Sequence, residues 1–265
     1  MCRLLLLMGS NGTAAGYLLK AFSDASECDP YLAELRGSEG CESHDDGWGY
    51  ALIGHRNERS FSKHYRSCAP VFKDPELDNL RALLNGFDRF TLIAHSRKIS
   101  KGGVELRNTH PFHYSHLGFD LWIAHNGTVR DEEIAEEKCW HYDEDLSDTY
   151  YLGRYIYEAL SESSLVFVFN RASRFVKEHS AMNTVSILSR DEIEAVATCF
   201  YRAKNRSYEN YYRLLEFRSH GVVGVISSTI GRYLEGVELR ELPNGWGISF
   251  REGTGDSIRR EMFEI

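Results

Sequence analysis

The sequence contains few of the features that mark linkers, membrane spans or nucleotide sites. Only five prolines occur among 265 residues, and no low-complexity stretch divides the chain. No apolar run approaches the roughly 20 residues of a membrane-spanning helix. Neither the G-x-G-x-x-G nor the G-x-x-x-x-G-K pattern of a phosphate-binding loop is present. We therefore expect a single domain over residues 1–265, with no membrane span and no cofactor.

The beginning of the chain also lacks the features of a secretory signal. The apolar run from Leu4 to Met8 has five residues, fewer than the roughly 7–15 of a signal peptide, and no small-residue cleavage site follows it. We expect a buried strand there and a cytoplasmic protein. No C-x-x-C pair occurs among the cysteines, so we expect free thiols without a disulfide framework. The six cysteines are Cys2, Cys28, Cys41, Cys68, Cys139 and Cys199.

Positive charge is not in excess either. The formal net charge is −8, and the most acidic stretch, residues 131–145, contains eight carboxylates against one lysine. A surface that binds phosphates needs the opposite sign of charge. The sequence therefore argues against nucleic acid as a partner.

Short apolar runs bounded by turn residues predict several strands. Helical periodicity predicts one helix over 148–161, capped by Ser147 or Asp148, and proline at position 75 predicts another over 75–84. Since strands outnumber helices and short connections join several of them, we expect an α+β protein with mainly antiparallel sheets. The predicted strands cover 4–8, 48–53, 90–95, 121–125, 185–188, 195–199 and 221–227.

Cys2 is the residue with the most direct route to chemistry. Removal of Met1 would leave a thiol and a free α-amine on the same residue. An α-amine has a pKa of about 7.7–8.0 and can accept the thiol proton at cellular pH. Cys2 would then supply both a nucleophile and a base. A cysteine at position 2 is weak support when taken alone, so its neighbours in the fold decide the matter.

Polar residues follow two of the predicted strands and open the predicted helix. The Asn126 amide and the Gly127 backbone N–H suit the oxyanion that forms when a nucleophile attacks an amide. The Arg97 guanidinium suits an α-carboxylate, and Asp148 suits an α-ammonium group. Each also has a plainer explanation. The Asn126-Gly127 pair could form a hairpin turn, Arg97 a surface ion pair and Asp148 a helix cap. Together with Cys2 they favour an amide-cleaving site.

These motifs, in this order, resemble the class II glutamine amidotransferases, and most of all the single-domain members without an attached synthase. The resemblance extends over nearly the whole chain. Its segments are Cys2, Asp46-Gly47-Trp48-Gly49-Tyr50, His95-Ser96-Arg97, Asn108-Thr109-His110-Pro111-Phe112, His125-Asn126-Gly127 and Ser147-Asp148-Thr149.

The resemblance implies a four-layer αββα sandwich of the N-terminal-nucleophile hydrolase type. It implies that the γ-amide of glutamine, or of a γ-glutamyl compound, is hydrolysed through a thioester, with release of ammonia or an amine. The residues to which it assigns roles are Cys2 as nucleophile, Asn126 and Gly127 as oxyanion hole, Arg97 and Asp148 as ligands of the carboxylate and the amine, His110 in the pocket, and Trp48 and Gly49 as support.

Three departures from the family pattern bear on specificity. Tyr150 stands where many relatives have glutamate, Lys98 stands where the synthases have tryptophan, and Ser227-Ser228-Thr229 replaces a more usual Ser-Glu-Pro. They leave the nucleophile and the oxyanion hole intact. Strict specificity for glutamine, however, does not follow from the resemblance.

The sequence leaves two other classes of function open. One is a catalytically silent binding or regulatory subunit. The other is a metalloprotein, because five histidines lie within about thirty residues, although their spacing matches no H-E-x-x-H motif. An active glutaminase would release ammonia to water or to a partner protein, and the oligomeric state is undetermined. The five histidines are His95, His110, His113, His116 and His125.

Overall fold

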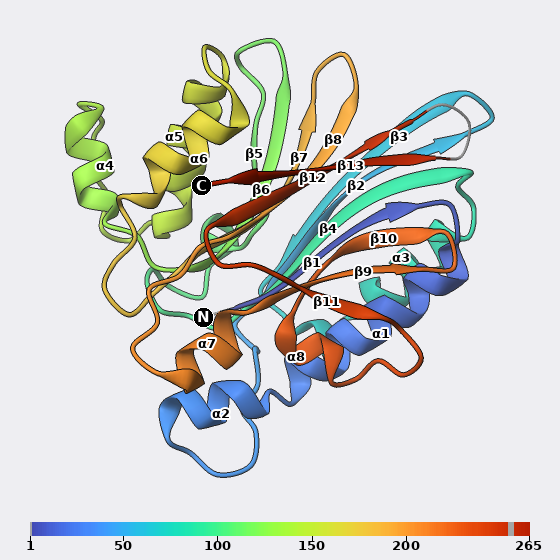
Figure 1. Ribbon diagram of the computed structural model, residues 1–265, viewed down its shortest axis with the longest axis horizontal. Helices are drawn as coiled ribbons and strands as arrows, with labels where there is room; N and C mark the ends of the chain where they lie inside the picture. The colour runs from blue at the N-terminus through green and yellow to red at the C-terminus, as the bar shows by residue number, and fades with distance from the viewer. Residues whose placement is uncertain (1, 254–256) are drawn as a thin grey trace.

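Two β-sheets stacked face to face form the centre of the protein, and helices cover their outer faces (Figure 1). The structure is a computed structural model that describes residues 2–253 and 257–265. Met1, whose removal would free the α-amine of Cys2, lies outside these residues. All described strand pairs are antiparallel. The expected α+β sandwich of antiparallel sheets is confirmed.

The first sheet has seven strands in the order β11-β9-β10-β1-β4-β2-β3, so that β1 is central. Their bounds are β1 Cys2–Gly9, β2 Trp48–Arg56, β3 Arg59–Ser67, β4 Arg89–Arg97, β9 Leu214–Ser219, β10 Val222–Ser227 and β11 Leu239–Leu242.

The second sheet has six strands in the order β13-β12-β8-β7-β6-β5. Their bounds are β5 Phe112–Tyr114, β6 Asp120–Gly127, β7 Met182–Ser189, β8 Ile193–Cys199, β12 Trp246–Glu252 and β13 Ile258–Glu264.

Helices form the two outer layers. Helices α1, α3 and α8 contribute to the core on the outer face of the first sheet, and α4, α5 and α6 to the core on the second, while α2 and α7 pack against each other at one end. The bounds are α1 Gly12–Glu27, α2 Pro30–Arg36, α3 Glu76–Leu84, α4 Asp131–Glu137, α5 Asp148–Leu160, α6 Leu165–Ser173, α7 Arg206–Tyr212 and α8 Ser228–Gly231, with short 3-10 turns at Val71–Lys73 and Leu106–Asn108.

Strand β1 is buried on both faces, which explains its continuous apolar sequence. Leu4 and Leu6 face the core between the sheets, whereas Leu5 and Leu7 face the core beneath α1. Successive side chains of a strand point to opposite faces, so these two cores fix which way every residue of β1 points. Cys2 therefore faces the second sheet. None of the helices in the described part of the chain has the length and apolar character needed to cross a membrane.

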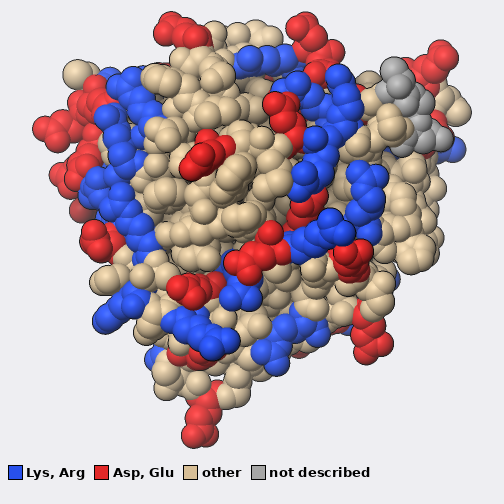
Figure 2. Space-filling view, in the orientation of Figure 1, with Lys and Arg blue, Asp and Glu red and all other residues tan. Residues whose placement is uncertain are grey.

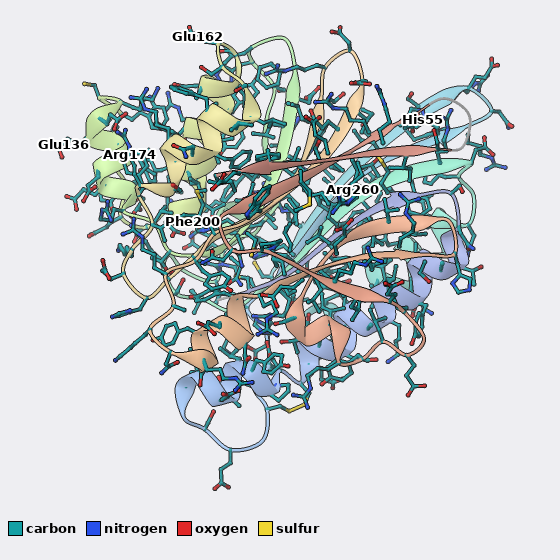
Figure 3. The ribbon with its side chains drawn as sticks, viewed as in Figure 1. His55, Glu136, Glu162, Arg174, Phe200 and Arg260 are labelled. Atoms are coloured by element: carbon teal, nitrogen blue, oxygen red, sulfur yellow. A yellow bond between two sulfur atoms is a disulfide. The ribbon has the colours of Figure 1, made fainter. Side chains whose placement is uncertain are left out.

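Ion pairs tie the two sheets together at the surface. Arg260 of β13 donates to Glu216 of β9 at 2.7 Å, and Arg89 of β4 donates to Glu252 of β12 at 2.8 Å. Arg260 is labelled in Figure 3, where it lies near the middle of the view. Positive and negative side chains are both present over the face that Figure 2 shows.

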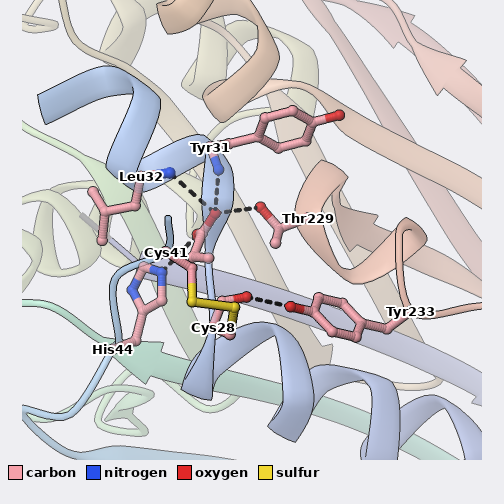
Figure 4. The surroundings of a disulfide bond; sticks show 8 residues. Cys28, Tyr31, Leu32, Cys41, His44, Thr229 and Tyr233 are labelled. Carbon is pink, nitrogen blue, oxygen red and sulfur yellow. Dashed lines mark hydrogen bonds and ion pairs between the residues drawn. A yellow bond between two sulfur atoms is a disulfide. The ribbon is translucent and has the colours of Figure 1, made fainter. Parts of the chain in front are cut away.

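Cys28 and Cys41 form a disulfide bond (Figure 4), so the expectation of free thiols was wrong for this pair. The chain after α1 folds back on itself, and the backbones of Asp29 and Glu42 pair through N–H···O bonds of 2.7 and 3.2 Å. This pairing brings the two cysteine Cα atoms to 5.1 Å, within the range that a disulfide requires. The spacing of the two cysteines along the sequence does not indicate that their Cα atoms lie this close. The free cysteines are Cys2 and Cys199, which are buried, and Cys68 and Cys139, which are exposed.

A buried cluster of charged and polar groups lies on the face of β1 opposite Cys2. The Arg3 guanidinium contacts the Asp29 carboxylate at 3.2 Å and lies 4.0 Å from the centre of the Tyr211 ring. His44 and Thr229 donate hydrogen bonds to the same carboxylate at 2.8 and 2.9 Å. The side chains of Arg3, Asp29 and His44 are completely buried.

The Asp29 carboxylate is held in its charged form by this cluster. Burial raises its pKa, but Arg3 and then the hydrogen bond from His44 outweigh burial, so the pKa lies well below its usual value. The other oxygen of Asp29 also accepts from the first backbone N–H groups of α2, Tyr31 and Leu32. The cluster therefore fixes β1, the disulfide segment and α2 relative to one another.

Replacing Asp29 by asparagine is expected to lower the free energy of unfolding by about 3–5 kcal/mol, because Arg3 would remain buried without a counter-charge. Urea unfolding measures the change. Asp78→Asn is the matched control, since Asp78 is exposed in an (i, i+3) pair with Arg81 and its loss should cost below about 1 kcal/mol. Equal effects of the two substitutions would contradict the importance of the cluster.

Cys41→Ser is expected to lower the free energy of unfolding by about 2–4 kcal/mol, because it releases the closed loop in the unfolded chain. Thiol reductant should produce the same loss in the wild-type protein and none in the variant. Cys68→Ser, which removes an exposed free thiol, serves as the control. A Cys41→Ser protein as stable as Cys68→Ser would show that the bond contributes nothing.

Candidate functional site

Cys2 lies at the start of β1, where the ends of the two sheets meet. Its side chain is 6% exposed, and it is paired with Arg97 in the register of β1 and β4. Its backbone N–H donates a 2.9 Å hydrogen bond to Oδ1 of Asn126, at the end of β6 in the other sheet. One hydrogen bond thus joins the proposed nucleophile to the proposed oxyanion-hole residue.

Asn126 and Gly127, the predicted oxyanion-hole residues, lie together at the end of β6. The Nδ2 atom of Asn126 is buried and has no hydrogen-bond partner among the described residues, so it is a free donor beside Cys2. Gly127 has φ of +147°, and a Cβ there would lie 1.8 Å from the carbonyl oxygen of Ala181. Only glycine fits this position. The Asn-Gly pair therefore ends a strand and does not form the hairpin turn that such a pair commonly makes.

Arg97 and Asp148 face the same cavity from different elements. Arg97 ends β4 and donates to the carbonyl oxygens of Gly103 and Lys101 at 2.9 and 2.8 Å. Asp148 opens α5 and accepts from the Val129 backbone N–H at 2.9 Å. Both side chains are almost completely buried, so each is held in one orientation.

The start of α5 is held in place by the Asn108-Thr109-His110 segment. Asn108 accepts from the Ser147 backbone N–H and donates to the Asp145 carbonyl, both at 2.8 Å. The hydroxyl of Ser147 caps α5 by accepting from Thr149 N–H and lies 3.3 Å from Nε2 of His110. Asn108 thus holds the start of α5, a role that its motif alone did not indicate.

Three of the five clustered histidines lie at the site. His95, His110 and His125 are buried, and the rings of the first two lie 4.1 Å apart. Burial, followed by the charge of His95, holds the pKa of His110 well below its usual value, and burial lowers that of His125. His113 instead stacks on Trp122. In the described residues no three His, Cys, Asp or Glu side chains are arranged to hold a metal ion.

The environment of Cys2 favours the thiolate. Burial alone raises the pKa of the Cys2 thiol, but nearby positive charge, that of His95 included, outweighs burial. The pKa is therefore held well below its ordinary value. The other buried free thiol behaves differently, because burial raises the pKa of Cys199 to about 12. Of these two thiols only Cys2 is in an environment that activates it.

The site encloses a cavity of about 10 Å³, which is room for about one water molecule. Of the residues predicted from the sequence, five line it and Asn126 is bonded to one of them. The lining residues are Cys2, Arg97, Lys98, Ser100, Lys101, His110, His125, Gly127, Ser147, Asp148 and Thr149.

The two remaining predicted residues lie outside the cavity. Trp48 faces the core beneath α1, and its indole N–H donates to Asp74 at 2.9 Å. Gly49 faces the site side of the sheet, and a Cβ on it would lie 2.4 Å from the His110 carbonyl oxygen. Gly49 thus allows the His110 segment to approach β2, whereas Trp48 has no contact with the cavity.

Part of the chain is similar in sequence to known proteins. The family model of the class II glutamine amidotransferases matches residues 24–144. A protein of Haemophilus influenzae named "Putative glutamine amidotransferase" is 32% identical over 90 residues, which are 34% of this chain and 28% of that protein. The Escherichia coli K12 protein "Putative glutamine amidotransferase YafJ" is 28% identical over 104 residues, 38% of each chain.

Among solved structures, the glutamine phosphoribosylpyrophosphate amidotransferase of B. subtilis superposes with a TM-score of 0.54 at 14% identity, which shows a shared fold. The superposition covers 97% of this chain and 48% of that one. Each of these matches thus spans less than half of the other protein. Over residues 24–144 the chain is therefore similar to the class II glutamine amidotransferases, and over nearly its whole length it shares the fold of one of them.

Proposed function

We propose that the protein hydrolyses the γ-amide of glutamine, or of a γ-glutamyl compound, through a thioester on Cys2. The observation that carries the proposal is the junction of Cys2 and Asn126, where a thiol with a lowered pKa lies beside a free, buried amide donor. A nucleophile next to an unoccupied donor is what acyl transfer needs and what a structural core avoids.

The steps follow from the geometry. The Cys2 thiolate adds to the amide carbon, and the developing oxyanion takes hydrogen bonds from Nδ2 of Asn126 and the backbone N–H of Gly127. The α-amine of Cys2, which took the thiol proton, passes it to the leaving nitrogen as the C–N bond breaks, so that ammonia or an amine departs and a γ-glutamyl thioester remains. Water then hydrolyses the thioester and restores the thiol.

Arg97 and Asp148 are suited to hold the α-carboxylate and α-ammonium of the donor. In the described conformation the Arg97 guanidinium is occupied by the carbonyls of Lys101 and Gly103. The cavity of about 10 Å³ is also smaller than a glutamine side chain. Segment 98–105 therefore has to move away for the substrate to enter.

Met1 has to leave before the reaction, and ammonia leaves the site after it. Removal of Met1 is required, because an acylated Cys2 nitrogen is not a base. The ammonia is released to water or to a partner protein. We place the reaction in the cytoplasm, although the Cys28–Cys41 bond gives this placement no support, because disulfides persist mainly in oxidising compartments.

Tyr150, which replaces a glutamate of many relatives, does not obstruct this mechanism. Its ring packs edge-to-face with Phe112 and Tyr151 and does not line the cavity. The departure therefore gives no support to a catalytically silent subunit, which is the alternative that the following experiment tests.

Intact mass spectrometry after incubation with a glutamine-analogue electrophile should show loss of one methionine residue and addition of one adduct. Cys2→Ala should form no adduct and release no ammonia from glutamine, because it lacks the nucleophile. Cys199→Ala is the matched control, since it removes the other buried free thiol. Retention of Met1 with no adduct would support the silent subunit instead.

Asn126→Ala should lower kcat for glutamine hydrolysis by about 10²–10³-fold, since it removes one oxyanion donor. KM should change little, because the oxyanion exists only after attack. Steady-state ammonia release measures both parameters. Asn170→Ala, on the exposed side of α6, is the control. A KM effect with unchanged kcat would place Asn126 in substrate binding and not in the oxyanion hole.

A further inference from the structure

The Cys28–Cys41 disulfide is open to exchange with other thiols. Cys41 is exposed and Cys28 is half-buried, so an incoming thiolate has access to Sγ of Cys41. In the cytoplasm, where the reaction is proposed to take place, disulfides are usually transient, catalytic or redox-sensing. What the bond controls depends on the residues that follow it in the chain.

Residues 42–47, which follow the disulfide directly, connect the end of α1 to the end of β4. The His44 backbone N–H donates to the Ser26 carbonyl oxygen of α1 at 2.7 Å, and the His44 ring contacts the Asp29 carboxylate at 2.8 Å. Figure 4 shows His44 beside the disulfide. On the other side, the His44 carbonyl oxygen accepts from the Ser96 hydroxyl at 3.1 Å. A change at the disulfide therefore has a direct route to β4.

The same residues hold the start of segment 98–105. The Arg97 backbone N–H donates to the Gly47 carbonyl oxygen at 2.8 Å, and the Arg97 carbonyl oxygen accepts from the Asp46 N–H at 3.1 Å. The Asp46 carboxylate also accepts from the Ile99 backbone N–H at 2.8 Å. The position of this segment thus depends on residues 42–47, and through them on the disulfide.

Segment 98–105 in turn determines access to Cys2. Three of its residues line the small cavity together with Cys2. The carbonyl oxygens of Lys101 and Gly103 occupy the Arg97 guanidinium. Because the Cys2 side chain is only 6% exposed, a substrate or a reagent reaches its thiol through an opened form of the site.

We propose that the Cys28–Cys41 bond is a thiol–disulfide exchange site that controls access to Cys2, an inference that rests on the proposed function for the substrate that enters. A thiolate of a dithiol reductant attacks Sγ of Cys41, and the S–S electron pair leaves on Sγ of Cys28, which takes a proton from water. The second thiol of the reductant then attacks the mixed disulfide and releases Cys41. The protein gains two electrons and two protons, and the reductant becomes a disulfide.

The oxidised protein is the closed form, and reduction favours opening. The bond keeps residue 41 attached to the end of α1 even when residues 42–47 lose their contacts, so it limits the chain entropy gained on opening. Reduction removes this limit. For a closed loop of this size the opened population should rise by about 10–100-fold. A reducing compartment would thus keep the site accessible, and oxidation would close it.

The test is the rate of iodoacetamide alkylation at Cys2 without glutamine, followed by peptide mass spectrometry. Three samples are compared: oxidised wild type, wild type reduced by a phosphine that is then removed, and the Cys28→Ser/Cys41→Ser variant. The last two should be alkylated at Cys2 about 10–100-fold faster than the first, because the rate follows the opened population. The phosphine should not change the rate in the variant.

The other free thiols are controls within each sample. Cys199 is completely buried in the core between the sheets and should react slowly in all three samples. Cys68 and Cys139 are exposed and should react at the same rate throughout. An unchanged Cys2 rate in reduced wild type overturns the proposal, and so does equal acceleration at Cys199, which would show general unfolding. If the double variant does not fold, reduced wild type alone decides.

The route from the disulfide to the cavity is tested in oxidised protein. Asp46→Ala removes the acceptor of the Ile99 N–H and should accelerate alkylation of Cys2 although the disulfide is intact. Asp45→Ala is the matched control, because the neighbouring carboxylate is exposed and pairs with Lys98 at the surface. Equal rates in the two variants would contradict this route.

Ammonia release from glutamine separates this proposal from the proposed function. If both hold, reduction should accelerate ammonia release in parallel with alkylation of Cys2. Redox-dependent alkylation without any ammonia release would leave the exchange site standing and refute the amidase. Ammonia release combined with alkylation that ignores the redox state would refute the exchange site and leave the amidase standing.

Discussion

The hydrogen bond from the Cys2 backbone to Asn126 is the interaction on which the site depends. It connects the central strand of one sheet to the end of β6 in the other, at the point where the core between the sheets gives way to polar groups. Without it, the thiol and the amide donor would belong to two independent layers. The stacking of the sheets therefore determines the distance between nucleophile and oxyanion hole.

Two buried polar clusters lie on opposite faces of the first residues of β1. On one face, Arg3 is neutralised by Asp29, which is itself fixed by His44 and by the helix start that it caps. On the other face, Cys2 lies among positive groups that favour its thiolate. Because neighbouring residues of a strand point in opposite directions, a shift of β1 by one residue would exchange the two environments. The Arg3–Asp29 pair thus also fixes the register that presents Cys2 to the site.

The sequence predicted the elements whose apolar pattern is strong and missed those whose pattern is weak. Strand β1 and helix α5, with Ser147 as its cap, follow directly from periodicity and capping. Helix α1 was missed because Gly12, Gly16 and its serines lower helix propensity, although it is largely buried. Strand β3 is largely exposed and polar, and only pairing with β2 makes it a strand.

Only some residues of the site could be predicted from the sequence, because contacts in the fold decide the role of the others. Residue type alone indicates the chemistry of Cys2, Arg97, Asn126 and Asp148. His95, by contrast, is distinguished by what its ring does not contact, which no sequence shows. The disulfide depends on the backbone pairing of Asp29 with Glu42, which likewise could not be predicted from the sequence. Trp48 shows the converse, because its motif lies next to the site while its side chain faces the opposite core.

The most direct test of the account is to trap the acyl-enzyme. Enzyme mixed with glutamine, quenched in acid within the first turnovers and digested, should yield an N-terminal peptide that begins at Cys2 and carries one glutamyl group on its thiol, labile to hydroxylamine. That result would establish nucleophile, processing and donor together. A glutamyl group on another residue, or ammonia release with no glutamyl group on Cys2 under any quench, would contradict the central claim.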